Sequence, residues 1–114
     1  MSDCVFCRIG DGSLPADVVA EGDAWVAFRD LQPQAPTHLL IIPRRHVATA
    51  NDLVGADDAL MGELVRAAAE IAAREGVAEA GYRLVCNTNR GAGQSVFHLH
   101  LHLLAGRPLA WPPG

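Results

Sequence analysis

The sequence predicts an α+β fold in which one long helix packs on one face of an antiparallel sheet. Histidine and leucine alternate from His98 to Leu104, and a period of two is typical of a strand. Apolar residues recur at helical spacing from Asp57 to Glu75. With five short strands around this helix, the 114-residue chain is expected to form a single domain, residues 1–114.

Turn residues delimit the strands. Gly22-Asp23 indicates a hairpin, Pro43 ends the strand before it, and Gly91-Ala92-Gly93 joins the last two strands in antiparallel order. We expect a helical turn at Cys4–Gly10, an irregular segment at Asp30–Pro36, and strands at Val18–Glu21, Ala24–Phe28, Thr37–Ile42, Tyr82–Asn87 and Ser95–Leu104.

Capping residues delimit the helix. Asp57 and Asp58 suit its positive N-terminal end, and Gly76 suits its C-terminal end. Cys86, in the apolar strand that follows, is expected to be a small core residue. The predicted core-facing stripe of the helix is Leu60, Leu64, Val65, Ala68, Ile71 and Ala72.

Composition excludes several classes of partner. The net charge is −4 and there is no basic block, so the general electrostatic footprint for nucleic acid is missing. No stretch approaches the roughly 18 apolar residues of a membrane span. The N-terminus lacks the basic and apolar regions of a signal peptide, which predicts a cytoplasmic protein. The three cysteines are then not expected to form a disulfide framework.

The histidine row is the main candidate for chemistry. On a strand, His98, His100 and His102 project from one face, roughly 6–7 Å apart, and the leucines project from the other. That spacing suits a small charged group such as a phosphate; the alternative is a strand whose solvent face merely carries histidines. Neutral imidazole can ligate a metal, shuttle protons or attack phosphorus.

The residues before the row also suit a phosphate. Gly91 and Gly93 allow unusual backbone angles that bring amides close to a ligand. A Gly-x-Gly pattern alone is a weak indication, and it gains specificity because the histidine row follows directly. Side-chain hydrogen-bond donors are added by Asn87, Gln94 and Ser95.

With these residues the chain resembles the histidine triad (HIT) superfamily, whose signature alternates three histidines with hydrophobic residues. It is similar in particular to the Hint branch of nucleoside phosphoramidate hydrolases. In a related transferase branch the third triad position is glutamine, so His102 favours hydrolysis. The matching segments are His98–Leu104, Asp30–His38, Ile42–His46, Gly93–Phe97 and the terminal Trp111-Pro112-Pro113-Gly114.

The resemblance implies a two-step hydrolysis of purine nucleoside 5′-phosphoramidates. His100 would attack the α-phosphorus, the amine would leave, and water would release the nucleoside monophosphate from a nucleotidyl-histidine. His102, Ser95 and Asn87 would contact the phosphate or leaving group, and Gln94 would donate a further hydrogen bond.

The resemblance also implies the substrate contacts and a homodimer. Asp30 would bind the ribose hydroxyls, and His38 would either hold the ring of a triad member or fill space. The Trp111 tail would reach the partner's active site. The slot for the base would be formed by Phe6, Ile9, Leu14, Phe28 and Leu31, for which sequence alone favours ordinary core positions.

A second site is indicated by Cys4-x-x-Cys7. The motif suggests a redox pair or half of a tetrahedral zinc site, and the βαβ context of a redox motif is absent. The resemblance implies a structural Zn²⁺, not required for chemistry, whose other ligands are His46 and His98. Two unligated thiols are the alternative.

Three other functions stay open at this point. The chain could cleave dinucleoside polyphosphates, although its Trp-Pro-Pro-Gly ending argues against this. It could be a nucleotide-binding regulatory module with incidental catalysis, or a three-histidine metalloenzyme.

Overall fold

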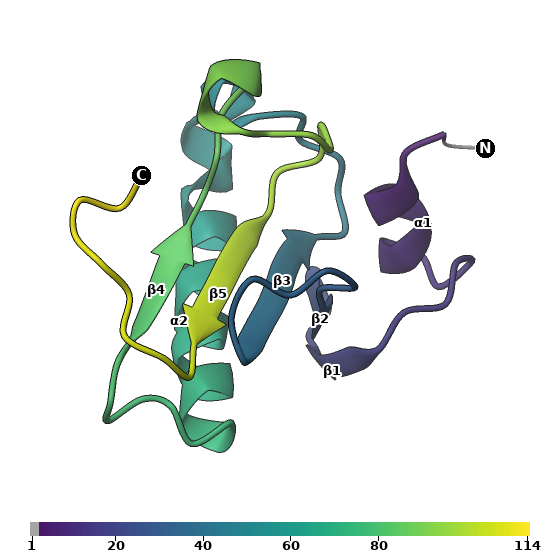
Figure 1. Cartoon of the computed structure of the whole chain (residues 1–114). Coiled ribbons are helices and arrows are strands. Elements are labelled where there is room, and N and C mark those ends of the chain that lie inside the picture. Colours follow the sequence, from purple (N-terminus) through teal and green to yellow (C-terminus); the bar gives the residue numbers. More distant parts are fainter. Residues whose placement is uncertain (1–2) are drawn as a thin grey trace.

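A computed structural model describes residues 3–114 and confirms the α+β prediction. Five antiparallel strands form one sheet in the order β1-β2-β3-β5-β4, and the long helix α2 runs along one face (Figure 1). The strands are β1 (Val18–Glu21), β2 (Trp25–Arg29), β3 (Thr37–Pro43), β4 (Tyr82–Val85) and β5 (Leu101–Ala105). The helices are α1 (Val5–Gly10) and α2 (Asp58–Arg74), with 3₁₀ turns at Ala50–Asp52, Gly55–Asp57 and Arg90–Ala92.

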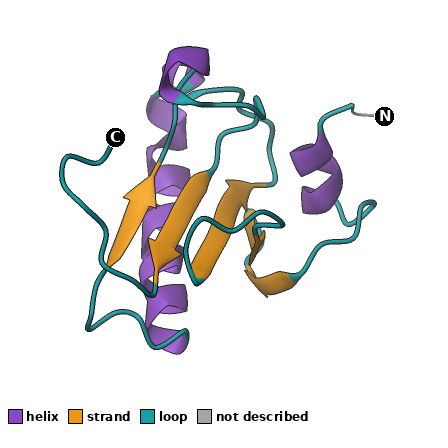
Figure 2. Cartoon of the chain, in the orientation of Figure 1, coloured by secondary structure: helices purple, strands orange, loops and turns teal. Residues whose placement is uncertain are grey.

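α2 covers one face of the sheet (Figure 2), and Phe6 of α1 packs against residues of β2 and β3 on the other face. Leu39 and Ile41 of β3 point into the main core under α2, whereas Leu40 and Ile42 point into a smaller cluster that includes Phe6 of α1. The alternation follows from the two-residue period of a strand. Because β3 is buried on both faces, the stretch 39–43 after Thr37 and His38 is a continuous apolar run.

The predicted helical stripe is confirmed at Leu64, Ala68, Ile71 and Ala72, which are buried against the sheet. The prediction is wrong for Val65, whose side chain is 47% exposed. Residue 65 lies 100° around the helix from residue 64, at the edge of the buried face, where its side chain still meets solvent. Ala67 takes its place in the core, and Leu60 is half-buried near the start of the helix. No helix among residues 3–114 is long and apolar enough to cross a membrane.

The histidine strand is shorter than predicted. The prediction was Ser95–Leu104, and β5 begins only at Leu101, which pairs with Ile41 of β3. The ladder cannot extend because β3 ends at Pro43, which has no N–H and whose carbonyl receives the His98 ring. The leucine face is nonetheless confirmed, since Leu99, Leu101 and Leu103 all lie in the main core.

The fourth strand is also shorter than predicted. β4 ends at Val85, which pairs with His102, and the two following residues lie beyond the sheet. The prediction that Cys86 is a core residue is therefore wrong: its side chain is exposed.

Candidate active site and metal site

A cleft of about 790 Å³ opens on the face of the sheet opposite α2. Its walls come from α1, the segment before β1, the loop after β2 and the glycine turn, while β3 and β5 form its floor. Of the predicted site residues, the cleft is lined by Phe6, Ile9, Leu14, Phe28, Asp30, Leu31, His38, Ser95, His100 and His102.

His100 presents a lone pair to this cleft. Its ring Nδ1–H donates to the backbone carbonyl of His98 at 2.7 Å, so the other nitrogen, Nε2, carries no proton in the neutral ring. The ring is only 8% exposed and meets the ring of Phe6 edge to face, with centroids 5.1 Å apart. Packing and hydrogen bonding together fix the orientation of this imidazole, as a nucleophile requires.

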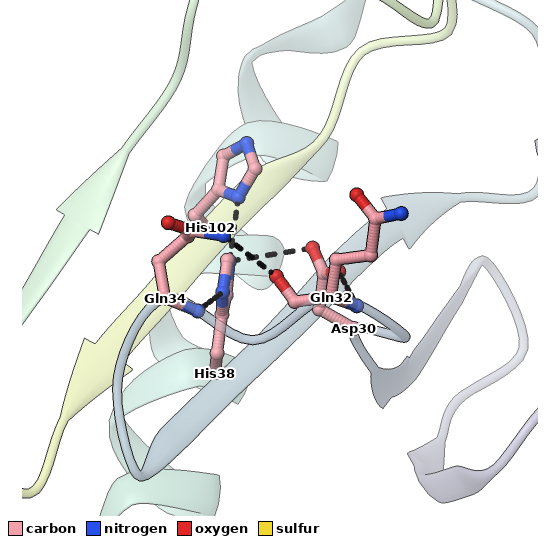
Figure 3. Close-up of polar contacts among 5 residues, drawn as sticks. All are labelled: Asp30, Gln32, Gln34, His38 and His102. Atoms are coloured by element: carbon pink, nitrogen blue, oxygen red, sulfur yellow. Dashed lines mark hydrogen bonds and ion pairs between the residues drawn. The ribbon is translucent and has the colours of Figure 1, made fainter.

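His102 presents a proton, because its neighbour His38 is held in one tautomer (Figure 3). The backbone N–H of Gln34 donates to Nδ1 of His38 at 3.0 Å, so neutral His38 carries its proton on Nε2. That atom lies 2.9 Å from Nδ1 of His102 and 3.4 Å from Oδ2 of Asp30. Accepting this hydrogen bond at Nδ1 leaves the proton of His102 on Nε2.

Both rings of this pair are held neutral. Burial, aided by the nearby imidazoles of His100 and His38, lowers the pKa of His102 from 6.5 to about 4, although the Asp30 carboxylate opposes the shift. Burial also lowers the pKa of His38, again against Asp30. The rings of His100 and His102 lie 4.9 Å apart between centroids. The cleft therefore offers a nitrogen lone pair beside an N–H donor.

Asp30, His38 and His102 have ligand-type atoms within 4.8 Å of one another, an arrangement that a divalent metal can use. The hydrogen-bond directions disfavour this use. A metal needs the lone pair of His38 Nε2, and moving the proton to Nδ1 would set it against the Gln34 N–H. In this cluster a chain of hydrogen bonds runs from the backbone N–H of Gln34 through His38 to His102. The chain determines which nitrogen of His102 carries the proton.

The second cluster fits a metal. The ligand atoms of Cys4, Cys7, His46 and His98 lie within 4.8 Å of one another. The sulfur of Cys7 lies 3.2 Å from Nδ1 of His46 and 3.4 Å from Nδ1 of His98, and the ligand atoms of a tetrahedral zinc site lie roughly 3.3–3.8 Å apart.

His98 is prepared for the role of ligand. Its Nε2–H donates to the Pro43 carbonyl at 2.7 Å, which leaves the lone pair on Nδ1, the atom that faces the sulfurs. The side chain is fully buried, and burial lowers its pKa, so the ring stays in the neutral form that metals bind. Donor types, spacing and tautomer all suit zinc.

Two predicted residues, Gln94 and Asn87, do not line the cleft. The prediction that the Gln94 amide faces the substrate is wrong: it is 3% exposed, donates to Ala48 and Val96 carbonyls, and accepts from the Asn89 N–H. Through these backbone hydrogen bonds the Gln94 side chain stabilises the glycine turn. Asn87 does not line the cleft, but its amide nitrogen would lie 3.9 Å from a Cβ at Gly93, which does.

The two remaining departures concern exposure. Trp111 is 83% exposed in the segment after β5 and does not line the cleft of its own chain. Leu31 lines the rim of the cleft while 95% exposed. The contribution that sequence reasoning missed is the backbone N–H of Gln34, because no pattern of residue types reports a main-chain donor.

The comparisons with known proteins agree with this geometry. The family described as the HIT domain matches residues 11–109. A relative in Escherichia coli K12 named purine nucleoside phosphoramidase is 49% identical over 107 residues, covering 94% of this chain and 90% of the relative.

Solved structures agree as well. A HIT family hydrolase from Legionella pneumophila Philadelphia 1 superposes with a TM-score of 0.96 at 54% identity, covering 98% of this chain and 100% of that one. A zinc-bound histidine triad family protein from Mycobacterium smegmatis has a TM-score of 0.79 at 30% identity, covering 92% of this chain and 76% of that one. The chain is therefore a member of the HIT domain family.

Proposed function

We propose that the chain hydrolyses the P–N bond of purine nucleoside 5′-phosphoramidates through a nucleotidyl intermediate on His100. The observation that carries the proposal is the set of hydrogen-bond partners that assigns opposite tautomers to the two rings, a lone pair on His100 Nε2 beside a proton on His102 Nε2. The activity named for the Escherichia coli relative supports the choice of substrate.

The first step forms a bond from His100 Nε2 to the α-phosphorus and breaks the P–N bond, and the departing amine takes a proton from water in the open cleft. The attacking ring becomes cationic, and its Nδ1–H bond to the His98 carbonyl stabilises that charge. His102 Nε2–H donates to a phosphoryl oxygen, where negative charge accumulates. Water then attacks phosphorus, frees His100 and releases the nucleoside monophosphate and a proton.

The remaining cleft residues bind the nucleoside. Asp30 accepts from the ribose hydroxyls, while Ser95 and Asn87 contact the phosphate or the leaving group. The base lies among the apolar side chains at the α1 end of the cleft, which are Phe6, Ile9, Leu14, Phe28 and the rim residue Leu31.

The Cys₂His₂ cluster holds a structural zinc ion in this proposal. A closed four-ligand shell keeps no position for a reacting water, so the ion supplies stability and no step of the reaction. Its two cysteines bracket the first turn of α1, whose Phe6 walls the cleft beside His100. The ion would therefore keep one wall of the nucleoside site in place.

A homodimer completes the proposal. β4 is an edge strand, paired only with β5, and an unpaired edge is favourable to cover with a two-fold copy. The exposed Trp111 then has a partner surface to reach. Light scattering at micromolar concentration tests this, and a monomer would contradict it.

Single-turnover reaction with adenosine 5′-phosphoramidate tests the mechanism. We expect His100→Ala to lower the rate by about 1,000-fold or more, and acid quenching of the wild type to trap a nucleotidyl adduct on His100. An adduct on another residue, or undiminished turnover by the variant, would overturn it. Faster turnover of diadenosine polyphosphates would point to the rival hydrolase activity.

A further inference from the structure

Gln34 has both of its backbone polar groups engaged. Its N–H donates to Nδ1 of His38, which sets the tautomer of that ring. Its carbonyl accepts from Nη2 of Arg107 at 2.9 Å, and Nη1 of the same guanidinium donates to the Pro108 carbonyl at 3.1 Å. Arg107 follows β5 and is 73 residues distant from Gln34 in sequence. One arginine thus ties the end of the histidine strand to the loop that orients His38.

The loop has few other attachments. Between Leu31 and Pro36, a stretch that the structure describes in full, Ala35 is the one buried residue. The chain after β5 packs closely against this loop, since a Cβ at Gly106 would lie 2.8 Å from Cβ of Pro36. Contact and hydrogen bond both come from the segment after β5, so that segment fixes where the Gln34 N–H points.

We propose that Arg107 is a positioning residue for the reaction: it holds the Gln34 backbone so that His38, and through it His102, keeps a single tautomer. The inference rests on the proposed function for its catalytic consequence. The effect of Arg107 on the tautomers of His38 and His102 does not depend on the proposed function, because it can be measured without any substrate.

The consequence of losing Arg107 follows from the hydrogen-bond chain. Without a fixed Gln34 N–H, the Asp30 carboxylate, 3.4 Å from Nε2, still favours the Nε2 proton of His38, but a fraction of the rings carry it on Nδ1, and in that fraction His102 loses its donor. Only part of the population would retain the His102 Nε2–H, so kcat falls about three- to tenfold, as expected for one hydrogen bond of this kind. KM changes little, because Asp30 keeps its own bonds to the His38 carbonyl and the Gln32 N–H.

Three variants test the inference. Arg107→Ala removes the clamp, and Arg107→Lys keeps a cationic donor. Arg66→Ala makes the same change of charge on the exposed face of α2, where the side chain is 70% exposed and pairs with Glu70. The zinc-loaded proteins are compared by ring ¹⁵N NMR without substrate, and by kcat and KM with adenosine 5′-phosphoramidate. If Arg107→Ala does not fold, Arg107→Gln takes its place.

We expect the wild type, Arg107→Lys and Arg66→Ala to show one tautomer of His38, unprotonated at Nδ1, and Arg107→Ala to show averaging between two tautomers together with the lower kcat. An unchanged His38 tautomer in Arg107→Ala would overturn the inference, even if kcat fell, because the role would then be merely structural. A wild type that lacks phosphoramidase activity would refute the proposed function, while the NMR result would still decide whether Arg107 holds the tautomer.

Discussion

The low pKa of His102 makes the stability of the fold depend on pH. The unfolded ring takes up a proton near pH 6.5, whereas the folded ring does so only near pH 4. Between these values the unfolded state binds more protons, so acid favours unfolding. The stabilising contribution of the neutral ring is therefore complete above pH 6.5, and it is lost as the pH falls toward 4.

The magnitude follows from the size of the shift. A decrease in pKa from 6.5 to about 4 corresponds to about 3 kcal/mol between the two limits. Between pH 7 and pH 5, where the folded ring is still neutral, the expected loss is about 2 kcal/mol. That is a large fraction of the net stability of a small domain.

Urea unfolding of the wild type and His102→Gln at pH 7 and pH 5 measures this loss. Glutamine retains an acceptor for the His38 N–H and does not titrate. Both proteins are studied with chelator, so that proton-linked loss of metal contributes to neither. We expect the wild type to lose about 2 kcal/mol more than the variant between the two pH values. Equal losses would show that burial does not hold the folded His102 ring neutral below pH 6.5 and would refute this reasoning.

Three further predictions concern the metal, the cleft wall and a turn. Cys7→Ser should abolish stoichiometric zinc and lower the melting temperature of protein purified without chelator; zinc analysis and calorimetry measure both. Phe6→Ala should cost about 3–5 kcal/mol in urea unfolding, since Phe6 is 7% exposed, and should raise KM for a nucleoside phosphoramidate. Gly106→Ala should cost about 2–3 kcal/mol, because φ is 96° and a Cβ would lie 2.8 Å from Pro36. Gly12→Ala, at φ 84° in open space, should cost only about 1 kcal/mol by the same measurement.

The elements that sequence reasoning located best are those with a clear hydrophobic period. The face of α2 and the leucines of the histidine row follow their periods, and their burial confirms the predictions. Strand ends were located less well, because they depend on a partner strand. β5 begins only at Leu101, near the point where Pro43 ends β3, and the exposed Cys86 lies just beyond Val85, the last residue of β4 that pairs with β5.

The candidate site divides in a similar way. The histidine row and Cys4-x-x-Cys7 were found as motifs, whereas the other cleft residues and the ligands His46 and His98 were implied by the resemblance to the HIT superfamily; the structure brings each set together. The Gln94 amide was misplaced because its partners are backbone groups of Ala48, Val96 and Asn89, which no spacing reveals. The tautomers were beyond prediction for the same reason, since backbone groups fix them.

The three triad histidines are chemically identical residues whose roles are separated by the partner of one ring nitrogen each. His98 and His100 donate to backbone carbonyls, so each keeps a lone pair on its other nitrogen, one facing the sulfurs and one facing the cleft. His102 accepts a hydrogen bond, so its other nitrogen keeps a proton. The carbonyl that orients His100 belongs to His98, whose ring faces the metal-type cluster. A metal ion bound to the His98 ring would therefore also hold the His98 carbonyl in place. That carbonyl accepts from Nδ1 of His100 and so leaves Nε2 as the nitrogen available for attack.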